Sequence, residues 1–301
     1  MGKLLIEIAY DENKNIVFVN NAVKGKMYFC PKCGEELIFK NSGKTGQGSR
    51  CPHFAHKGCG GHNCDPESVL HAAFKKETAK ILSSHLKEST GFNIKWRCSD
   101  CGSQYSGDLL FLAKTIEVEY DLKVCRPDIA LLDDAGKVRI AIEIVNTHAP
   151  EEKVEKYYND NGIVLVQYNV HEDDLLNIEE KLLKPDIVSL CLNSACKTFV
   201  ASLLSRRIDT EKATCKRCGK QVDVFYAEYQ SPLGHILYYG INNNDLLVLE
   251  KKGIASNMLM KATFTKNNIS IDTIATKCPC VKNVYYTFSR SPRRRRRYPS
   301  F

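Results

Sequence analysis

The sequence lacks a long apolar run near its start. Leu4, Leu5 and Ile6 are followed at once by Glu7, so nothing there has the length of a signal peptide's apolar region or of a membrane-spanning helix. Gly2 is not followed by Ser or Thr at the sixth position, which argues against myristoylation. We therefore expect an intracellular protein, in the cytoplasm, the nucleus or the nucleoid, that has no membrane partner.

The composition also lacks a bias that would decide the class of protein. Hydrophobic residues make up 43% of the 301 residues and charged residues 26%, which is ordinary for a soluble fold and excludes neither an enzyme nor a binding module. A chain of this length can form one large domain or two modest ones. The class must therefore come from motifs.

The net positive charge is small outside the C-terminus. Of the formal net charge of +8, Arg290 and Arg293 to Arg297 supply six charges, which leaves +2 for the rest of the chain. The tail, residues 290–301, is too self-repelling to fold alone, but it suits phosphate backbones, acidic partners, nuclear import or association with a virus particle. A merely solvated, disordered tail is the alternative.

Cysteine, by contrast, is abundant. The chain has 14 cysteines, many in CxxC-type pairs, and in a reducing compartment this spacing indicates zinc ligands rather than disulfides. Together with the change of pattern along the chain, these pairs suggest a zinc-binding region at 1–64, a core at 65–184, a β-rich zinc-binding domain at 185–289, and the tail at 290–301. We expect roughly two or three structural zinc ions per chain.

The spacing of the cysteines and histidines assigns the zinc ligands only in part. Cys30 and Cys33 form an N-terminal knuckle between short strands, and its partners come from Cys51, His53, His56, Cys59 and Cys64. The spacing Cys191-x₄-Cys196-x₁₈-Cys215-x₂-Cys218 is close to that of a zinc ribbon. Cys98 and Cys101 then need two more ligands, with Cys278 and Cys280 left over. In the alternative pairing, Cys98 and Cys101 join Cys191 and Cys196, and Cys215 and Cys218 join Cys278 and Cys280.

The core begins with a helix, from Asp65 and Pro66 to about Lys87. On it Glu67, His71 and Lys75 fall at i, i+4 and i+8 and form one polar stripe. Strands follow at 92–145, including a hairpin of 127–132 with 138–145, then a helix at about 150–159 and a buried strand at 162–166. This order predicts an α/β (α+β) fold with a mixed sheet flanked by helices.

Two carboxylates in the hairpin are candidates for a metal site. An antiparallel register brings Asp128 and Glu143 to one end of the sheet, where their oxygens suit a hard divalent cation. Bound Mg²⁺ or Mn²⁺ would polarise a phosphodiester and lower the pKa of an attacking water. Alternatively, Asp128 caps a turn after Pro127 and Glu143 faces solvent. We favour the metal site because Glu143 interrupts the apolar run 140–145, where a carboxylate is costly unless paired.

Several ordered motifs carry a resemblance to a known family. Arg126-Pro127-Asp128 with Ile142-Glu143-Ile144 resembles the PD-(D/E)xK nuclease superfamily. Cys30-x-x-Cys33, His53-Phe54-Ala55-His56 and Glu67-Ser68-Val69-Leu70-His71 resemble its competence protein CoiA-like branch. The resemblance covers about residues 25 to 170. It implies a restriction-endonuclease-like core and cleavage of nucleic acid, DNA ahead of RNA, with zinc modules that aid binding.

The resemblance also implies roles for particular residues. It favours His53 and His56 as partners of Cys30 and Cys33, with Cys51 as a substitute, and it makes Glu67 and His71 site residues. The superfamily's usual lysine, two positions after the second carboxylate, is Val145 in this chain. Lys75, Lys153 and His148 are its possible replacements. Without one, the chain would be a nucleic-acid-binding or packaging protein on a nuclease scaffold.

Overall fold

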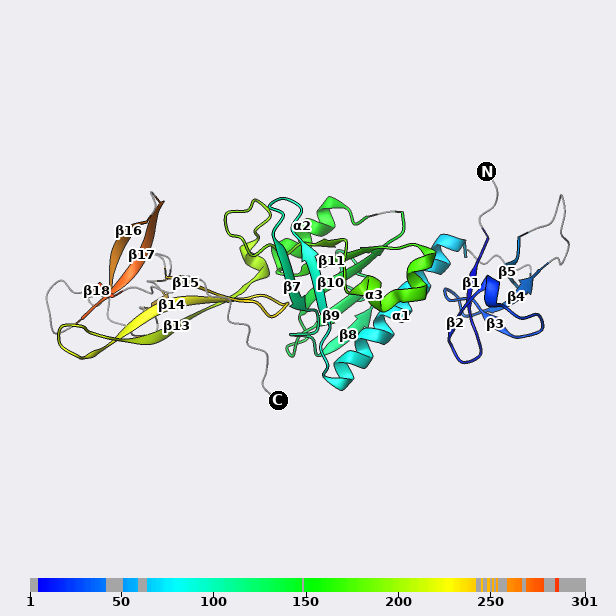
Figure 1. Ribbon diagram of the computed structural model, residues 1–301, viewed down its shortest axis with the longest axis horizontal. Coiled ribbons are helices and arrows are strands. Elements are labelled where there is room, and N and C mark those ends of the chain that lie inside the picture. The colour runs from blue at the N-terminus through cyan, green and yellow to red at the C-terminus, as the bar shows by residue number, and fades with distance from the viewer. Residues whose placement is uncertain are drawn as a thin grey trace. The chain divides into compact units, whose positions relative to one another are not determined.

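The structure, a computed structural model, describes residues 5–41, 51–58, 64–147 and 149–241, and further along the chain residues 245, 248–249, 251, 253, 259–266, 269–278 and 285–286. The chain divides into two compact units, residues 1–200 and 201–301. Both units consist mainly of strands, and the described residues form a mixed α+β fold (Figure 1). No helix among them is long and apolar enough to cross a membrane.

The first unit begins with an antiparallel sheet in the order β2-β1-β3-β4-β5. Its core includes Tyr28 and Phe54, whose ring centroids lie 5.1 Å apart, and the buried Leu37. Its elements are β1 (Ile8–Tyr10), β2 (Ile16–Phe18), the 3₁₀ turn η1 (Val19–Asn21), β3 (Tyr28–Phe29), β4 (Glu36–Lys40) and β5 (His53–His56).

The long helix α1 (Pro66–Glu88) follows this sheet, close to the predicted bounds. The Asp65 side chain caps it by accepting a hydrogen bond from the Ser68 amide at 2.8 Å, and Pro66 occupies the first turn, where its missing N–H costs nothing. Ser89, in the left-handed conformation, ends it. Val69, Ala73 and Phe74 are buried, but so is Lys75, which the sequence placed on a polar stripe.

A second five-stranded sheet, in the order β12-β11-β10-β9-β8, forms the centre of the first unit. β10 pairs antiparallel with β9 and parallel with β11, so the sheet is mixed, as predicted. All four residues of β9 are buried, and α1 contacts β8 and β10 while α2 contacts β11. The elements are β8 (Thr115–Val118), β9 (Ile129–Leu132), β10 (Val138–Val145), α2 (Glu152–Asn161), β11 (Val164–Asn169), η2 (Glu172–Asn177), α3 (Ile178–Leu182) and β12 (Ile187–Val188).

A separate hairpin of β6 (Asn93–Arg97) and β7 (Gln104–Asp108) completes this unit. Trp96 Nε1 donates to the carbonyl of Leu190 at 2.9 Å, which fastens the hairpin to the segment after β12. Residues 185–200 therefore belong to the first unit, whereas the sequence placed the boundary at 184.

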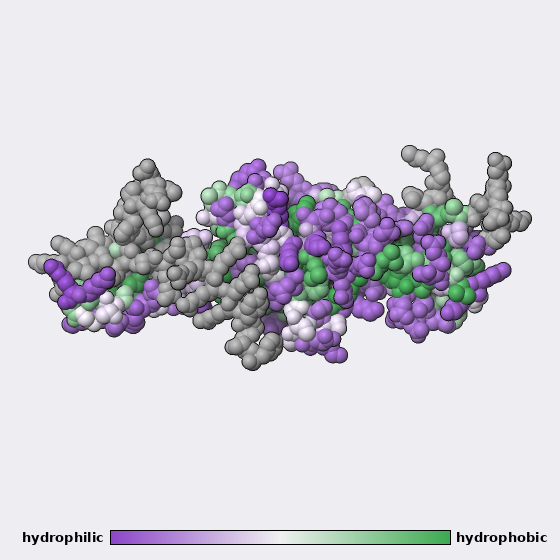
Figure 2. All heavy atoms as spheres, viewed as in Figure 1, coloured by the Kyte–Doolittle hydropathy of each residue, from purple (hydrophilic) through white to green (hydrophobic). Residues whose placement is uncertain are grey.

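The second unit is β-rich, in line with the sequence. β13, β14 and β15 form one antiparallel sheet, and β16, β17 and β18 form another. A shared apolar cluster includes Phe225, Leu259 and Ile274. The elements are η3 (Ala201–Leu203), β13 (Ser205–Thr214), β14 (Gln221–Gln230), β15 (Ile236–Gly240), β16 (Leu259–Lys266), β17 (Ile269–Lys277) and β18 (Tyr285–Tyr286). In Figure 2, hydrophilic side chains cover most of the visible described surface.

Candidate functional site

The two predicted carboxylates meet at one end of the central sheet. The register of β9 and β10 ends with the pair Ile129 and Ile142, and Asp128 and Glu143 lie one residue beyond it on each strand. The Ile144 amide donates to Asp128 Oδ2 at 2.9 Å, which fixes the orientation of that carboxylate. The antiparallel register therefore places both acids at the same point, as the hairpin predicted.

Both carboxylates open into a shallow cleft of about 280 Å³. Its wall is mixed: apolar residues lie beside two acids, a histidine and an arginine. The lining residues are His71, Cys125, Arg126, Asp128, Glu143, Ile144, Val145, Ala149, Pro150 and Val154. A larger hollow of about 730 Å³ lies between the β1–β2 turn and α1, and none of the candidate catalytic residues lines it.

Asp128 is held by groups from α1. His71 Nε2 lies 3.0 Å from Asp128 Oδ2, and Lys75 Nζ lies 3.3 Å from Asp128 Oδ1. Burial raises the pKa of Asp128, but the hydrogen bond and charge of His71, the Ile144 amide and the charge of Lys75 outweigh it, so the pKa lies below its usual value. Asp128 is therefore an anion at neutral pH.

Glu143 differs from Asp128 because its pKa lies above the usual value. Burial raises its pKa to about 7, and the nearby charge of Asp128 adds to the effect, although the Tyr158 hydroxyl and the Asp128 amide oppose it. The Tyr158 hydroxyl donates to Glu143 Oε1 at 2.6 Å. Two carboxylates that face each other in a poorly solvated site repel, and a cation between them would relieve that repulsion.

Tyr158 is a site residue that the sequence analysis missed. It lies on α2, has no exposed surface, and its hydroxyl is the side-chain donor to Glu143. Val154, one helical turn earlier, lines the cleft. The i, i+4 spacing of Val154 and Tyr158 marks the sheet-facing side of α2, and that spacing was a usable signal.

Lys75 reaches the site although it comes from a distant part of the chain. Its side chain is only 10% exposed, and its ammonium lies 2.6 Å from Glu119 Oε1 as well as beside Asp128. β8 ends at Val118, so Glu119 lies just beyond the strand. Glu119 itself has a φ of 55°, a left-handed conformation that is uncommon for residues other than glycine.

Two further predicted site residues, Glu67 and Lys153, are not at the carboxylate pair. Glu67 is exposed and accepts a hydrogen bond from the Thr147 hydroxyl. Lys153 is also exposed and pairs with Glu151 at 2.6 Å, because it lies on the outer side of α2, next to Val154 in the cleft wall. Val145 lines the cleft without a polar group. His148 lies outside the described residues.

The cysteine pairs share one local structure. Three segments read Cys-x-x-Cys-Gly, at residues 30–34, 98–102 and 215–219. In each, the first cysteine's amide donates to the carbonyl five residues later, and the glycine amide donates back to the first cysteine's carbonyl. Each glycine has a φ between 67° and 77°, which glycine adopts without strain. Each knuckle thus presents two thiols from one tight turn.

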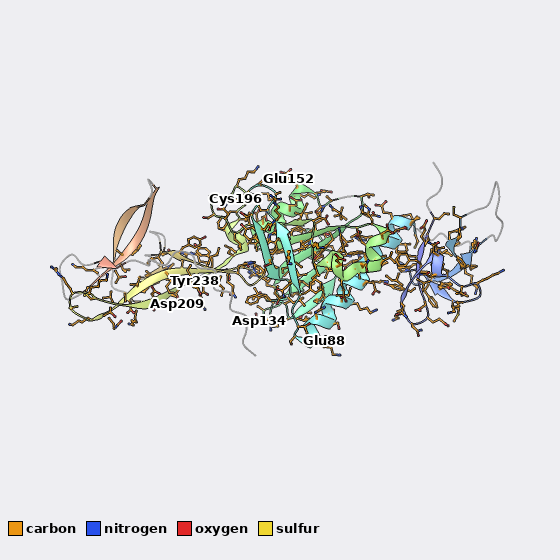
Figure 3. The ribbon with its side chains drawn as sticks, viewed as in Figure 1. Glu88, Asp134, Glu152, Cys196, Asp209 and Tyr238 are labelled. Atoms are coloured by element: carbon orange, nitrogen blue, oxygen red, sulfur yellow. The ribbon has the colours of Figure 1, made fainter. Side chains whose placement is uncertain are left out.

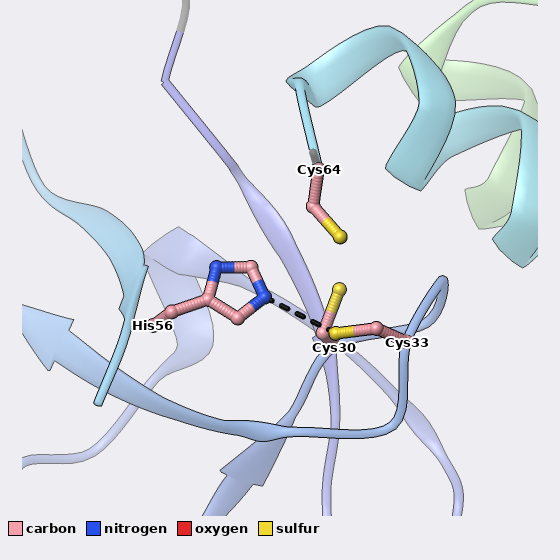
Figure 4. A group of neighbouring side chains, drawn as sticks. All are labelled: Cys30, Cys33, His56 and Cys64. Carbon is pink, nitrogen blue, oxygen red and sulfur yellow. Dashed lines mark hydrogen bonds between the residues drawn. The ribbon is translucent and has the colours of Figure 1, made fainter. Parts of the chain in front are cut away.

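The first knuckle gathers Cys30, Cys33, His56 and Cys64, whose ligand atoms lie within 4.8 Å of one another (Figure 4). Cys33 Sγ is 3.3 Å from His56 Nε2. His53 is not part of the group: its Nδ1 lies 2.9 Å from the Cys51 carbonyl. Side chains alternate along a strand, so His53 and His56, three residues apart on β5, point to opposite faces. Cys64, just before α1, takes the expected place of His53.

The second knuckle, Cys98 and Cys101, joins Cys191 and Cys196, the latter labelled in Figure 3. Cys98 Sγ lies 3.8 Å from Cys196 Sγ, and Cys101 Sγ lies 3.8 Å from Cys191 Sγ. Ligands at Zn–S bonds of about 2.3 Å lie about 3.8 Å apart at the corners of a tetrahedron. The thiols are therefore spaced for zinc, and too far apart for a disulfide.

The third knuckle, Cys215 and Cys218, joins Cys278 at the end of β17, with Cys218 Sγ 3.7 Å from Cys278 Sγ. Cys280 lies outside the described residues. The zinc-ribbon set of Cys191, Cys196, Cys215 and Cys218 is thus incorrect. Among the described residues the groups follow the alternative pairing, of which the place of Cys280 stays a prediction. The reason is that β13 and β14 form their own hairpin in the second unit, while the hairpin of β6 and β7 lies beside the segment after β12.

The corrected first ligand set makes a direct prediction. Cys64→Ser should lose about one of the roughly three zinc ions that the three groups can hold, whereas His53→Ala should keep them all, because only Cys64 contributes a ligand atom. Elemental analysis of protein purified without chelator measures the count. Loss of an ion from His53→Ala, with the count unchanged in Cys64→Ser, would restore the original assignment.

The described residues therefore contain two kinds of centre. One is an oxygen-rich pair of carboxylates with a histidine and a buried ammonium beside it. The other is a set of three cysteine-rich groups that can hold zinc. No family model matches the chain, nor does any curated protein or any solved structure.

Proposed function

We propose that the protein is a metal-dependent nuclease of the CoiA-like branch of the PD-(D/E)xK superfamily, with a restriction-endonuclease-like core. The convergence of Asp128 and Glu143 at one end of the sheet carries the proposal. Around them, α1 and the hairpin of β6 and β7 precede the sheet strands β8, β9 and β10, and α2 and β11 follow. The central strands form a mixed sheet that contacts helices, which supports the proposed core.

The residues fit a hard divalent cation such as Mg²⁺ or Mn²⁺. Such ions prefer carboxylate oxygens, and the raised pKa of Glu143 shows that this carboxylate is poorly compensated by its surroundings. When bound, the ion would polarise the phosphodiester and acidify the attacking water. The zinc groups serve a separate, structural purpose, because thiolates are soft ligands and no member of the three groups lines this cleft.

The side chains of the site then have distinct roles. Asp128 and Glu143 would hold the cation, and the Tyr158 hydroxyl keeps Glu143 in place. His71 and the Ile144 amide orient Asp128. Lys75 brings an ammonium next to Asp128, which supplies from α1 the positive charge that Val145 does not supply from β10. Arg126, on the cleft wall, can contact a phosphate of the substrate.

Val145 also favours a second candidate, a nucleic-acid-binding or packaging protein that has lost catalysis on the same scaffold. A cleavage assay separates the two. Duplex DNA, single-stranded DNA and RNA are each incubated with the full, zinc-loaded chain and Mg²⁺ or Mn²⁺. Cleavage that depends on the added metal supports the nuclease; salt-sensitive binding without cleavage under either metal supports the scaffold protein.

The arginine-rich tail should contribute to binding in either case. It lies outside the described residues, but its six arginines can each neutralise a phosphate and release a counterion. Deleting residues 290–301 should weaken binding and reduce the slope of log K against log salt by up to about 5. A titration at several salt concentrations measures this, with a variant carrying six Arg→Ala changes as the matched control. An unchanged slope would remove the tail from the interface.

A further inference from the structure

Lys75 is a buried ammonium between two carboxylates. It projects from α1, its side chain is 10% exposed, and its Nζ lies 2.6 Å from Glu119 Oε1 and 3.3 Å from Asp128 Oδ1. Burying an ammonium is costly unless anions compensate it. Here one of the two compensating anions is Asp128, one of the two acids that face the cleft.

Glu119 is fixed in place for this contact. Its backbone is left-handed, with φ at 55°, and its amide donates to the Asp128 carbonyl at 3.0 Å. Such a conformation persists only when the surrounding structure enforces it. The hydrogen bond and charge of Lys75 lower the pKa of Glu119, so this acid is ionised. Glu119 thus holds Lys75 beside Asp128, and neither Glu119 nor Lys75 lines the cleft.

The arrangement resembles a two-metal site in which the Lys75 ammonium stands where one of the two metal ions would be. In two-metal phosphodiester enzymes, carboxylates bridge two cations about 3.5–4 Å apart. In this chain Asp128 lines the cleft together with Glu143 and also shares Lys75 with Glu119. With all three acids ionised, they and the ammonium leave a net charge of −2, which a single divalent ion balances.

We propose that the Lys75 ammonium, held by Glu119 and Asp128, is the second cation of this centre, so that the centre binds a single divalent ion. The inference rests on the proposed function, because it assumes that Asp128 and Glu143 bind a divalent metal. Lys75 is a built-in positive charge, and Glu119 is the positioning residue that keeps it beside Asp128.

The test counts Mn²⁺ rather than product. Zinc-loaded full chain is titrated with Mn²⁺, and bound ions are counted by paramagnetic resonance or calorimetry, since Mn²⁺ prefers oxygen ligands over thiolates. Wild type should bind about one ion, and Lys75→Met about two, because Glu119 and Asp128 are freed for a second cation. Adding Glu119→Gln to Lys75→Met should return the count to about one.

Two further variants locate the effect. Lys80→Met removes an exposed lysine of the same helix, 65% exposed and paired with Glu77, and should leave the count at the wild-type value. Asp128→Asn should abolish binding, which assigns the counted ion to this cleft. Thermal melts of every variant, recorded without Mn²⁺, identify any that do not fold.

The outcomes separate the two proposals. No tight Mn²⁺ in folded wild type overturns the metal site itself, and with it the proposed function. Two ions in wild type overturn the inference and leave the function standing, as does a single ion in folded Lys75→Met. If Lys75→Met does not fold, the wild-type count still decides between one cation and two.

Discussion

Asp128→Asn and Glu143→Gln should each abolish metal-dependent cleavage while the fold and nucleic-acid binding persist. Each change keeps the shape of the side chain but removes a negative charge that holds the cation against its hydration shell. Losing the cation removes both the activation of water and the stabilisation of charge in the transition state. These effects are worth several kcal/mol, so the cleavage rate should fall about 10³-fold or more.

The structure explains why the fold should survive. In Asp128→Asn the buried ammonium of Lys75 keeps its 2.6 Å partner Glu119, and the amide oxygen still accepts from Ile144. In Glu143→Gln the Tyr158 hydroxyl still finds an acceptor. Binding rests on other basic groups, and it can tighten as repulsion between carboxylate and phosphate falls.

Glu117→Gln is the matched control, because Glu117 is an exposed acid on the neighbouring strand β8. It should cleave at the wild-type rate. The measurement is cleavage with Mg²⁺ or Mn²⁺, run beside a thermal melt and a binding titration for each variant. Site variants that cut as fast as wild type would show that this pair is not the metal site.

The second large effect concerns the zinc group of Cys98, Cys101, Cys191 and Cys196. Cys98→Ser or Cys191→Ser should lose this zinc and lower the melting temperature of the first unit by roughly 10 °C or more. Cys98 and Cys191 are buried, and the group joins two segments about 90 residues apart in sequence. Structural zinc contributes about 10–16 kcal/mol in small domains, as much as a whole domain's net stability.

Cys51→Ser is the control for this experiment. Cys51 is exposed and belongs to none of the cysteine-rich groups in the described chain, so it should change neither the zinc count nor the melt. Zinc content and thermal unfolding are measured on the same preparations. If Cys191→Ser keeps its full zinc content and melts like wild type, the second group does not hold a structural ion.

Local features of the fold followed from the sequence. The start of α1 was predictable because Asp65, Pro66 and the apolar spacing act within a few residues of one another. The hairpin that carries Asp128 and Glu143 was predictable for the same reason, since its strands are adjacent in sequence and their register follows from a short turn. The sequence could therefore predict that Asp128 and Glu143 lie together at one end of the sheet.

The surroundings of the Lys75 side chain could not be predicted from local sequence. Its position at i+8 from Glu67 correctly gave its side of the helix, but whether that side faces solvent depends on what packs there. Glu119, 44 residues away, meets it only because β8 ends at Val118 and the chain turns into a left-handed conformation. Tyr158 is similar, since its hydroxyl gains its role only where α2 covers Glu143.

The cysteines show the same division. The sequence by itself determined the knuckles, because Cys-x-x-Cys-Gly builds a tight turn from five successive residues and needs glycine at its end. Only the tertiary structure decided which ligands complete each group. A zinc site needs ligand atoms that are close in space, and spacing along the chain could not choose between His53 and Cys64, or between Cys196 and Cys215. Strand alternation excluded His53, and the grouping of Cys191 and Cys196 with Cys98 and Cys101 excluded the ribbon. Both outcomes depend on how segments that are distant in sequence are arranged in the fold, and the spacing of neighbouring residues does not determine that arrangement.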